Sequence, residues 1–326
     1  MPAAEIIKPK ITIKVIGVGG GGNNIVRCVR EKSDLDITLI GINSDLRQLN
    51  TLHKQGIAVL PIGEKLTSGR GTGGRVELGE EAARSEERAI RSLLEGTDLV
   101  IIAATMGGGL GTGAAPVVAE IARDMEILSI GVVTTPFRFE MARKMQTAQA
   151  GIALMQEHTD ALITIRNDNL LKIAPNRNLS FIEAFALADE VLQQTVSCVA
   201  ELILTTGVIN VDFADVTTIF RQSASSDALL AIGVDETPQK AVRQAIESPL
   251  IDRDATGARG IVLNLTGAPS MSLRDVDEAV HYIRKSAHPE VNVIVGLVVQ
   301  SGMEGRVQAT LIATDFDDTY IRAVQD

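Results

Sequence analysis

The chain of 326 residues has few of the residue types on which metal, redox and nucleic-acid sites depend. It contains two cysteines, four histidines and no tryptophan, and aromatic residues make up only 3%. Cys28 and Cys198 fit no CxxC pattern, and the histidines show no HExxH or similar spacing, so we expect no metal site built from side chains. With a net charge of −10 and few aromatics, the sequence offers no basic surface for nucleic acid.

Long hydrophobic runs and two common nucleotide motifs are missing as well. No apolar run approaches the roughly 18 residues of a membrane span, and the N-terminal sequence MPAAEIIKPK has no apolar core for a secretion signal. We therefore expect a cytoplasmic protein without direct membrane insertion. The chain contains no GK dipeptide, hence no GxxxxGK[ST] loop, and no NKxD motif for guanine.

Glycine is abundant and is concentrated behind strand-like segments. The apolar run TDLVIIAA at 97–104 is typical of a buried parallel strand, and TMGGGLGTGAAP at 105–116 follows it before a helix. A strand at 11–18 likewise enters four glycines at 19–22. Glycine loops before helices let backbone N–H groups close around an oxyanion. The pattern predicts a site for a phosphate chain, although glycine clusters also serve as tight turns.

Strands and helices alternate through the first half of the chain. Further strands are predicted at 36–42, 57–61, 127–134 and 161–165. Between them we expect a flexible connection at 63–76, one charged helix at 77–95 and an amphipathic helix ending near residue 156. Such alternation implies right-handed crossovers and a parallel sheet, which binds ligands at the carboxyl ends of its strands.

A long helix is predicted between the two halves. Ser180 and Glu183 form a capping box, and the helical pattern continues to about Leu204, which gives a length of roughly 37 Å. Phe185 and Asp189 lie side by side on its apolar part. An aromatic ring beside a carboxylate could stack on a purine and accept two N–H bonds from guanine. An aspartate at the margin of a buried face is the equally open alternative.

A second, smaller α/β unit is expected after this helix. Its predicted strands are 228–234, 261–266, 291–299 and 307–314, with helices at 239–247 and 273–286. We therefore expect an α/β protein with a parallel-sheet nucleotide-binding domain, a long central helix, a smaller C-terminal α/β domain and flexible ends. The corresponding boundaries are 11–179, 180–206, 207–318, and 1–10 with 319–326.

A dinucleotide-binding oxidoreductase is one alternative. Gly17, Gly19 and Gly22 satisfy GxGxxG after a strand. An acidic residue about 20 positions further on should then hold the ribose of a nicotinamide cofactor. The nearest candidate at the end of the second strand is Asp45, 28 residues after Gly17, and this alternative leaves the glycine loop at 105–116 unexplained.

Six segments together resemble the FtsZ family of tubulin-like bacterial cell-division GTPases. They are GGGLGTGAAP, IKVIGVGGGGNN, PFRFE, ITIRNDNLL, FALADEVL and NVDFADV, and the resemblance runs from about Ile13 to Thr314. It implies GTP or GDP with Mg²⁺ as ligands, head-to-tail assembly of copies of the chain into filaments, and work alongside other division proteins. A paralogue that joins filaments but hydrolyses GTP slowly is the second alternative. The family's C-terminal linker and membrane-anchor-binding peptide have no counterpart after Asp326, so membrane recruitment is not carried over.

The resemblance also assigns ligand contacts. Expected near the phosphates and Mg²⁺ are Gly20, Gly21, Asn43, Asp45, Gly71, Thr72, Gly73, Gly107, Gly108, Gly109, Leu110, Gly111, Thr112 and Gly113. Expected at guanine or the ribose are Asn24, Glu140, Lys144, Asn167, Phe185 and Asp189. The chain departs from the family where Leu110 replaces a threonine, where residues 71–76 replace Gly-Ala-Gly-Ala-Asn-Pro, and where Lys144 replaces an arginine.

The catalytic candidates, implied by the same resemblance, are Asn210, Asp212 and Asp215. The long central helix carries them about 37 Å from the carboxyl edge of the sheet, out of reach of the chain's own nucleotide. Only the nucleotide of another copy could meet them, and a head-to-tail contact that does not close makes a filament. We expect Asp212 and Asp215 to orient and polarise the attacking water. A role of Asp212 as a helix N-cap is compatible with this.

Overall fold

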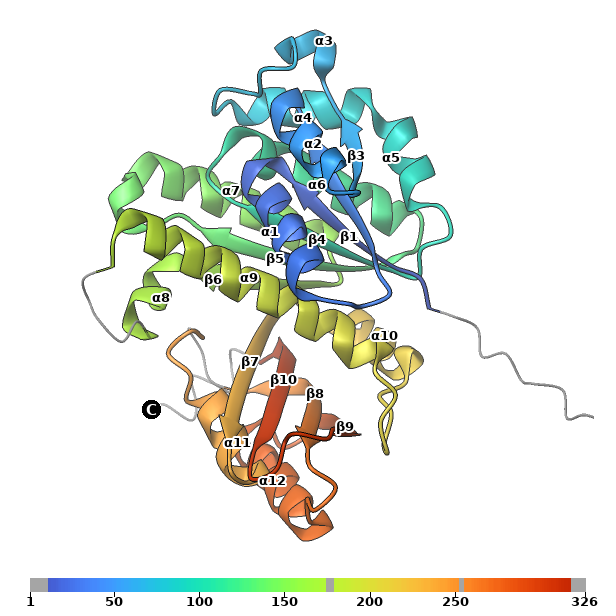
Figure 1. Cartoon of the computed structure of the whole chain (residues 1–326), viewed down its shortest axis with the longest axis vertical. Coiled ribbons are helices and arrows are strands. Elements are labelled where there is room, and N and C mark those ends of the chain that lie inside the picture. The colour runs from blue at the N-terminus through green and yellow to red at the C-terminus, as the bar shows by residue number, and fades with distance from the viewer. Residues whose placement is uncertain (1–10, 174–178, 252–254, 318–326) are drawn as a thin grey trace, which may run out of the picture.

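The structure is a computed structural model that describes residues 11–173, 179–251 and 255–317 (Figure 1). Its first part alternates strands and helices, which are β1 Ile13–Val18, α1 Gly19–Lys32, β2 Thr38–Asn43, α2 Leu46–Lys54, β3 Ala58–Pro61, α3 Glu64–Thr67, α4 Val76–Ser85, α5 Glu87–Leu94, β4 Leu99–Thr105, α6 Gly109–Asp124, β5 Leu128–Thr135, the 3₁₀ turn η1 Arg138–Glu140, α7 Ala142–His158, β6 Ala161–Arg166 and α8 Asn167–Ile173. The ends expected to be flexible, 1–10 and 319–326, lie outside the described residues.

The second part begins with the long helix. Its elements are α9 Phe181–Leu204, α10 Phe213–Gln222, β7 Asp227–Asp235, α11 Pro238–Ile246, β8 Ala258–Gly267, α12 Leu273–Ser286, β9 Asn292–Val299 and β10 Val307–Phe316. The predicted capping box opens α9, because Ser180 N–H donates to Glu183 Oε2 at 2.8 Å and Glu183 N–H donates to Ser180 Oγ at 3.3 Å.

The ten strands join in the order β3-β2-β1-β4-β5-β6-β7-β10-β8-β9. The first six run parallel, and β10 is antiparallel to both β7 and β8. Only two residue pairs, Leu162 with Asp227 and Ile163 with Ala228, connect β6 to β7. The predicted α/β class with a mostly parallel sheet is confirmed, and the sheet continues from β6 to β7 through this short seam.

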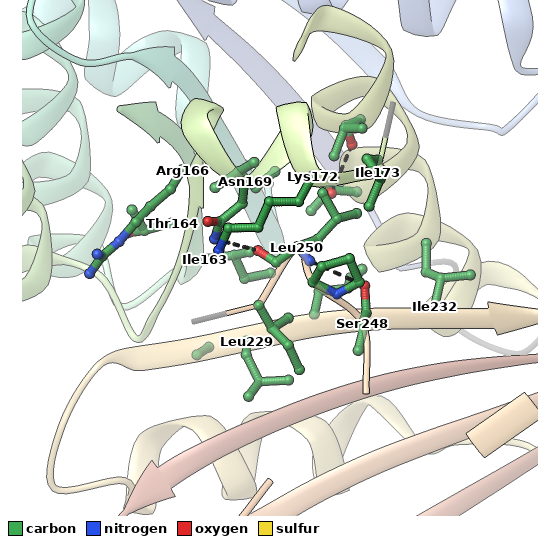
Figure 2. A pocket seen from close by; sticks show the side chains of 18 of the residues that line it. Ile163, Thr164, Arg166, Asn169, Lys172, Ile173, Leu229, Ile232, Ser248 and Leu250 are labelled. Atoms are coloured by element: carbon green, nitrogen blue, oxygen red, sulfur yellow. Dashed lines mark hydrogen bonds between the residues drawn. The ribbon is translucent and has the colours of Figure 1, made fainter. Parts of the chain in front are cut away.

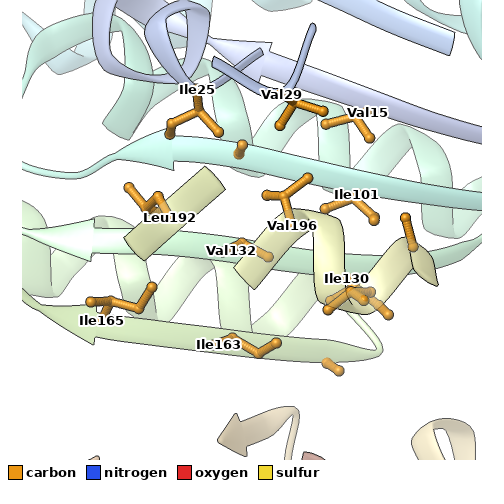
Figure 3. Packing of buried hydrophobic residues seen from close by; sticks show 14 of the residues in the cluster. Val15, Ile25, Val29, Ile101, Ile130, Val132, Ile163, Ile165, Leu192 and Val196 are labelled. Carbon is orange, nitrogen blue, oxygen red and sulfur yellow. The ribbon is translucent and has the colours of Figure 1, made fainter. Parts of the chain in front are cut away.

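Helices cover both faces of the parallel sheet because successive strand residues point to opposite sides. Val15 faces a cluster that contains Ile25 and Val29 of α1 and Leu192 and Val196 of α9 (Figure 3). The next residue of β1, Ile16, faces the other cluster, which is built from α4, α5 and α6. A third cluster packs α11 and α12 against β7, β8 and β10. The central helix α9 is therefore fixed to the parallel sheet along its length.

One helix prediction and one loop prediction are wrong. The segment predicted as one helix at 77–95 forms α4 and α5, which are separated at Glu86. The direction of α4 is set by α6, since a Cβ on Gly79 would lie 2.5 Å from the Gly109 carbonyl oxygen. The connection at 63–76 contains the short helix α3. In the part of the chain that the structure describes, no helix has the length and apolar character of a membrane span.

Candidate nucleotide-binding site

The first two glycine loops touch at the carboxyl edge of the sheet. A Cβ on Gly21 would lie 2.3 Å from Thr105 Oγ1, at the end of β4, so only glycine fits this contact. Gly20 beside it is exposed and lies near the Gln48 side chain of α2. Helices α1 and α6 begin inside these loops, without a capping side chain and without an acidic residue in the first turn. Their first N–H groups therefore lack side-chain acceptors, which is the condition for binding an anion.

The loop before α6 is shaped by its own side chains. Gly107 N–H donates to Thr112 Oγ1 at 2.9 Å, and Thr112 is only 1% exposed, so this hydroxyl holds the loop in shape. Gly108 is exposed, whereas Gly109, Gly111 and Gly113 are buried against neighbouring backbone.

Leu110 points into the fold. Its side chain is 6% exposed and belongs to the apolar cluster beneath α4, α5 and α6. Its backbone lies in the first turn of α6. Leu110 could therefore contact a phosphate only through its main chain. A threonine at this position, as in the family, would likewise point its hydroxyl into the fold.

The third loop packs directly on the second. A Cβ on Gly109 would lie 2.4 Å from Thr72 Oγ1 and 2.7 Å from the Arg75 nitrogen. Thr72 is buried, Gly73 is exposed, and the Gly71 N–H donates to the Ser44 carbonyl at 3.2 Å. The three loops thus meet at one edge, as the sequence predicted.

Asn43 and Asp45 are engaged in contacts that build this edge. Asn43 Nδ2 donates to Asn23 Oδ1 at 2.6 Å and to Gln48 Oε1 at 2.8 Å. Asp45 caps α2 by accepting from Arg47 N–H at 2.9 Å and pairs with the Arg47 guanidinium at 3.0 Å. The hydrogen bond from Arg47 lowers the pKa of Asp45. Asn23 and Gln48 were missed by sequence reasoning; the Asn-Asn pair at 23–24 was a signal for the first, and no pattern indicated the second.

The residues predicted to bind the base lie together on α1 and α9. Asp189 accepts a hydrogen bond from Asn24 and lies near the charge of Arg27, while burial raises its pKa. Phe185, one helical turn earlier, is 43% exposed and meets Phe137 edge to face at 5.5 Å. An aromatic surface next to an acceptor carboxylate is therefore present.

Asn167 is buried at the first position of α8, and its Oδ1 has no hydrogen-bond partner within the described residues. A buried acceptor without a donor is costly, so this atom suits a ligand that brings one.

Glu140 is the last residue of η1, and Lys144 lies in the first turn of α7. Glu140 Oε1 accepts from Phe137 N–H at 2.9 Å, and its Oε2 pairs with Lys144 Nζ at 3.0 Å. Nearby, Arg138 pairs with Asp168 at 3.2 Å, which ties η1 to α8. These contacts fix the loop after β5 beside the aromatic residues.

The structure does not bring the three catalytic candidates to this site. Helix α9 runs across the parallel sheet. It begins near α8 and ends near α10 (Figure 1). Asn210 Oδ1 accepts from Gly207 N–H at 2.6 Å, and Asp212 caps α10 by accepting from Ala214 N–H at 3.2 Å. Asp212 and Asp215 are exposed. The preceding loop is held by β9, since Val208 N–H donates to the Leu297 carbonyl at 2.8 Å.

A large cavity lies elsewhere. It has a volume of about 1230 Å³ and opens where β6 and β7 diverge, between α8, α9 and α11 (Figure 2). Its lining includes Thr164, Asn169 and Leu230, but no residue of the three glycine loops. Phosphate recognition requires converging N–H groups rather than volume, so the glycine loops remain the candidate site for a phosphate chain.

A parallel sheet with glycine loops at its carboxyl edge, joined by a long helix to a second α/β unit, defines the tubulin/FtsZ class of GTPases. The family model for the GTPase domain of the Tubulin/FtsZ family matches residues 12–175, and that for the C-terminal domain of the FtsZ family matches residues 227–317. The chain belongs to the FtsZ family. Membership in this family sets aside the dinucleotide-binding oxidoreductase.

Solved structures agree with this assignment. An empty FtsZ dimer of M. jannaschii is 36% identical, with 94% of this chain and 88% of that chain covered and a TM-score of 0.86. A point mutant of FtsZ from M. jannaschii is 35% identical, with 94% and 92% covered and a TM-score of 0.85. The protofilament of CetZ2 from Haloferax volcanii with bound GTPγS is 19% identical, with 96% of each chain covered and a TM-score of 0.80, and shows the fold alone.

Proposed function

We propose that this protein binds and hydrolyses GTP and assembles head to tail into filaments that serve as a cytoskeleton in bacterial cell division. The observation that supports the proposal is that the glycine loops lie at the carboxyl edge of the parallel sheet, whereas the exposed Asp212 and Asp215 follow the far end of α9. Residues 11–179 would bind the nucleotide, and residues 207–318 would complete the site of the next copy. The M. jannaschii FtsZ structure is a dimer, and self-association of that protein supports the same for this chain.

The phosphate chain fits the glycine loops. Two uncapped helix N-termini converge there, and the close approach at Gly21 leaves no room for a side chain. The backbone of residues 107–113 and 71–73 would surround the β- and γ-phosphates.

Guanine would bind beside α1 and α9, where Asn24 and Asp189 are joined by a hydrogen bond. Asp189 would accept from the two N–H groups on one edge of the base, and Phe185 would stack on its face. The unpartnered Oδ1 of Asn167 would accept a further hydrogen bond from the nucleoside. The Glu140 carboxylate, which is held by Lys144, would bind a ribose hydroxyl.

Mg²⁺ would be held mainly by phosphate oxygens and water, as is usual for nucleotide sites. Among the described residues no group of three His, Cys, Asp or Glu side chains could hold a metal, and the Asp45 carboxylate is shared between Arg47 and the start of α2. When bound, the ion offsets negative charge on the phosphates.

Hydrolysis would use the exposed Asp212 and Asp215 of the next copy in the filament. These carboxylates would orient a water molecule and accept its proton as it approaches the γ-phosphate of the neighbour. Asn210, fixed by Gly207, would help to position the same water. The alternative of a slowly hydrolysing paralogue is weakened. Leu110 was one reason for it, and its side chain is buried in the fold.

The test is phosphate release from GTP with Mg²⁺ over a range of protein concentrations. We expect the rate per molecule to rise steeply above a threshold concentration, because the site is complete only in the assembled state. A rate per molecule that stays constant from dilute to concentrated protein would show that each copy hydrolyses GTP by itself, against the proposal.

A further inference from the structure

Two arginines flank the third glycine loop and lack a carboxylate partner in the described part of the chain. Arg70 and Arg75 are exposed, and neither forms an ion pair there. Several other arginines of this domain are paired, such as Arg47 with Asp45, and Arg84 with Glu80 and Glu120, whereas Arg88 on α5 is exposed like Arg75. The chain has a net charge of −10. Two arginines without an ion pair, next to the glycine loops, would attract an anionic group such as a phosphate.

Arg75 is the closer of the two to the start of α6. A Cβ on Gly109, the first residue of that helix, would lie 2.7 Å from the Arg75 nitrogen and 2.8 Å from its carbonyl oxygen. No residue separates Arg75 from the backbone that would surround the phosphates. Arg70 lies on the other side of the loop, where its backbone forms a bridge with Asp45.

The Arg75 guanidinium has a weak contact that a ligand can replace. Its Nε donates to the Thr72 carbonyl at 3.5 Å, at the outer limit for a hydrogen bond. Around the intervening Gly73 and Gly74, the space where a Cβ would stand is free of atoms within 4 Å. The side chain can therefore leave Thr72 for a stronger acceptor without displacing packed atoms.

We propose that Arg75 binds the γ-phosphate of GTP held in the same subunit and thereby distinguishes GTP from GDP. This inference rests on the proposed function. The planar guanidinium carries five donors and binds phosphate oxygens in a fork, which the neutral N–H groups of the loops cannot do. Arg75 is thus a specificity-determining residue on the loop that packs against the start of α6.

The test compares the equilibrium binding of GTP and GDP to the wild-type protein and to three variants, below the concentration at which it assembles. Arg75→Ala should weaken GTP binding about tenfold or more and leave GDP binding within about twofold, as expected for one lost charge-assisted contact. Arg75→Lys keeps the charge without the fork and should fall between. Arg88→Ala removes an exposed arginine of α5 and should change neither affinity.

Each result has a distinct meaning. Equal weakening of GTP and GDP by Arg75→Ala, or an unchanged ratio of the two affinities, would overturn the role of Arg75 and leave the proposed function standing. A loss with Arg88→Ala as large as with Arg75→Ala would reduce the effect to net charge and overturn it as well. Failure of the wild-type protein to bind either nucleotide would overturn the proposed function, and with it the role of Arg75.

Discussion

Leu110 shows how a single side chain can mislead a comparison of motifs. Its position in a glycine loop suggests contact with the phosphates, yet the side chain is 6% exposed and packs in an apolar cluster. Sequence alone does not reveal this direction, because the loop residues become the first turn of α6, where successive side chains point in different directions. Thr112 is a similar case, since its hydroxyl accepts a hydrogen bond from Gly107 N–H within the loop.

Leu110→Thr should therefore destabilise the protein instead of improving the site. The change removes buried apolar atoms and places a hydroxyl among aliphatic side chains, which we expect to cost about 2 to 4 kcal/mol of the free energy of unfolding. Affinity for GTP should stay unchanged. Denaturant unfolding and nucleotide binding measure the two effects, and Leu110→Met is the control that keeps an apolar side chain. Tighter GTP binding by the threonine variant at full stability would mean that Leu110 faces the ligand.

The strands of the parallel sheet could be predicted from the sequence within about two residues, as 97–104 against β4 Leu99–Thr105 shows. A strand covered on both faces is a continuous apolar run, and this signal is local. Helix α8 was not predicted, because its Asn-Asp-Asn start has low helix propensity. Tertiary contacts hold it instead, with Leu170 fully buried and Asn169 bonded to the Leu250 carbonyl.

The contact between the second and third glycine loops can be tested with two neighbouring glycines. Gly109→Ala would place a Cβ 2.4 Å from Thr72 Oγ1 and 2.7 Å from the Arg75 nitrogen, so the loops must separate. We expect a loss of about 1 to 3 kcal/mol in unfolding free energy, as for overpacked cores, and weaker GTP binding.

Gly108→Ala is the matched control for this prediction. No atom lies within 4 Å of its added Cβ, and the backbone φ of −88° suits any residue. Its unfolding free energy should stay within about 0.5 kcal/mol of wild type. Equal destabilisation of the two variants would contradict the packing of Thr72 and Arg75 on Gly109.

The connection of the two units keeps the glycine loops and the candidates at 210–215 apart within one chain, as the proposed shared site requires. Helix α9 is packed on the parallel sheet through Leu192 and Val196, and its end is continued by a loop that is bound to β9. The 24 residues of α9 span about 36 Å. The candidates at 210–215 are thus held by rigid elements at a fixed distance from the glycine loops. This distance was foreseeable from helix length, whereas the seam between β6 and β7 depends on tertiary packing.

Mixing two inactive variants tests this arrangement directly. Asp212→Ala keeps the nucleotide site, and Asp189→Ala, which we expect to lose guanine binding, keeps the carboxylates at the other end. Each variant alone should release no phosphate above background. An equal mixture should regain roughly a quarter of the wild-type rate, because about one head-to-tail contact in four joins an intact nucleotide site to intact carboxylates. A mixture of Asp212→Ala with Asp215→Ala has both lesions at the same end and should stay inactive. If the first mixture stays as inactive as this second one, the carboxylates do not act on the nucleotide of another copy.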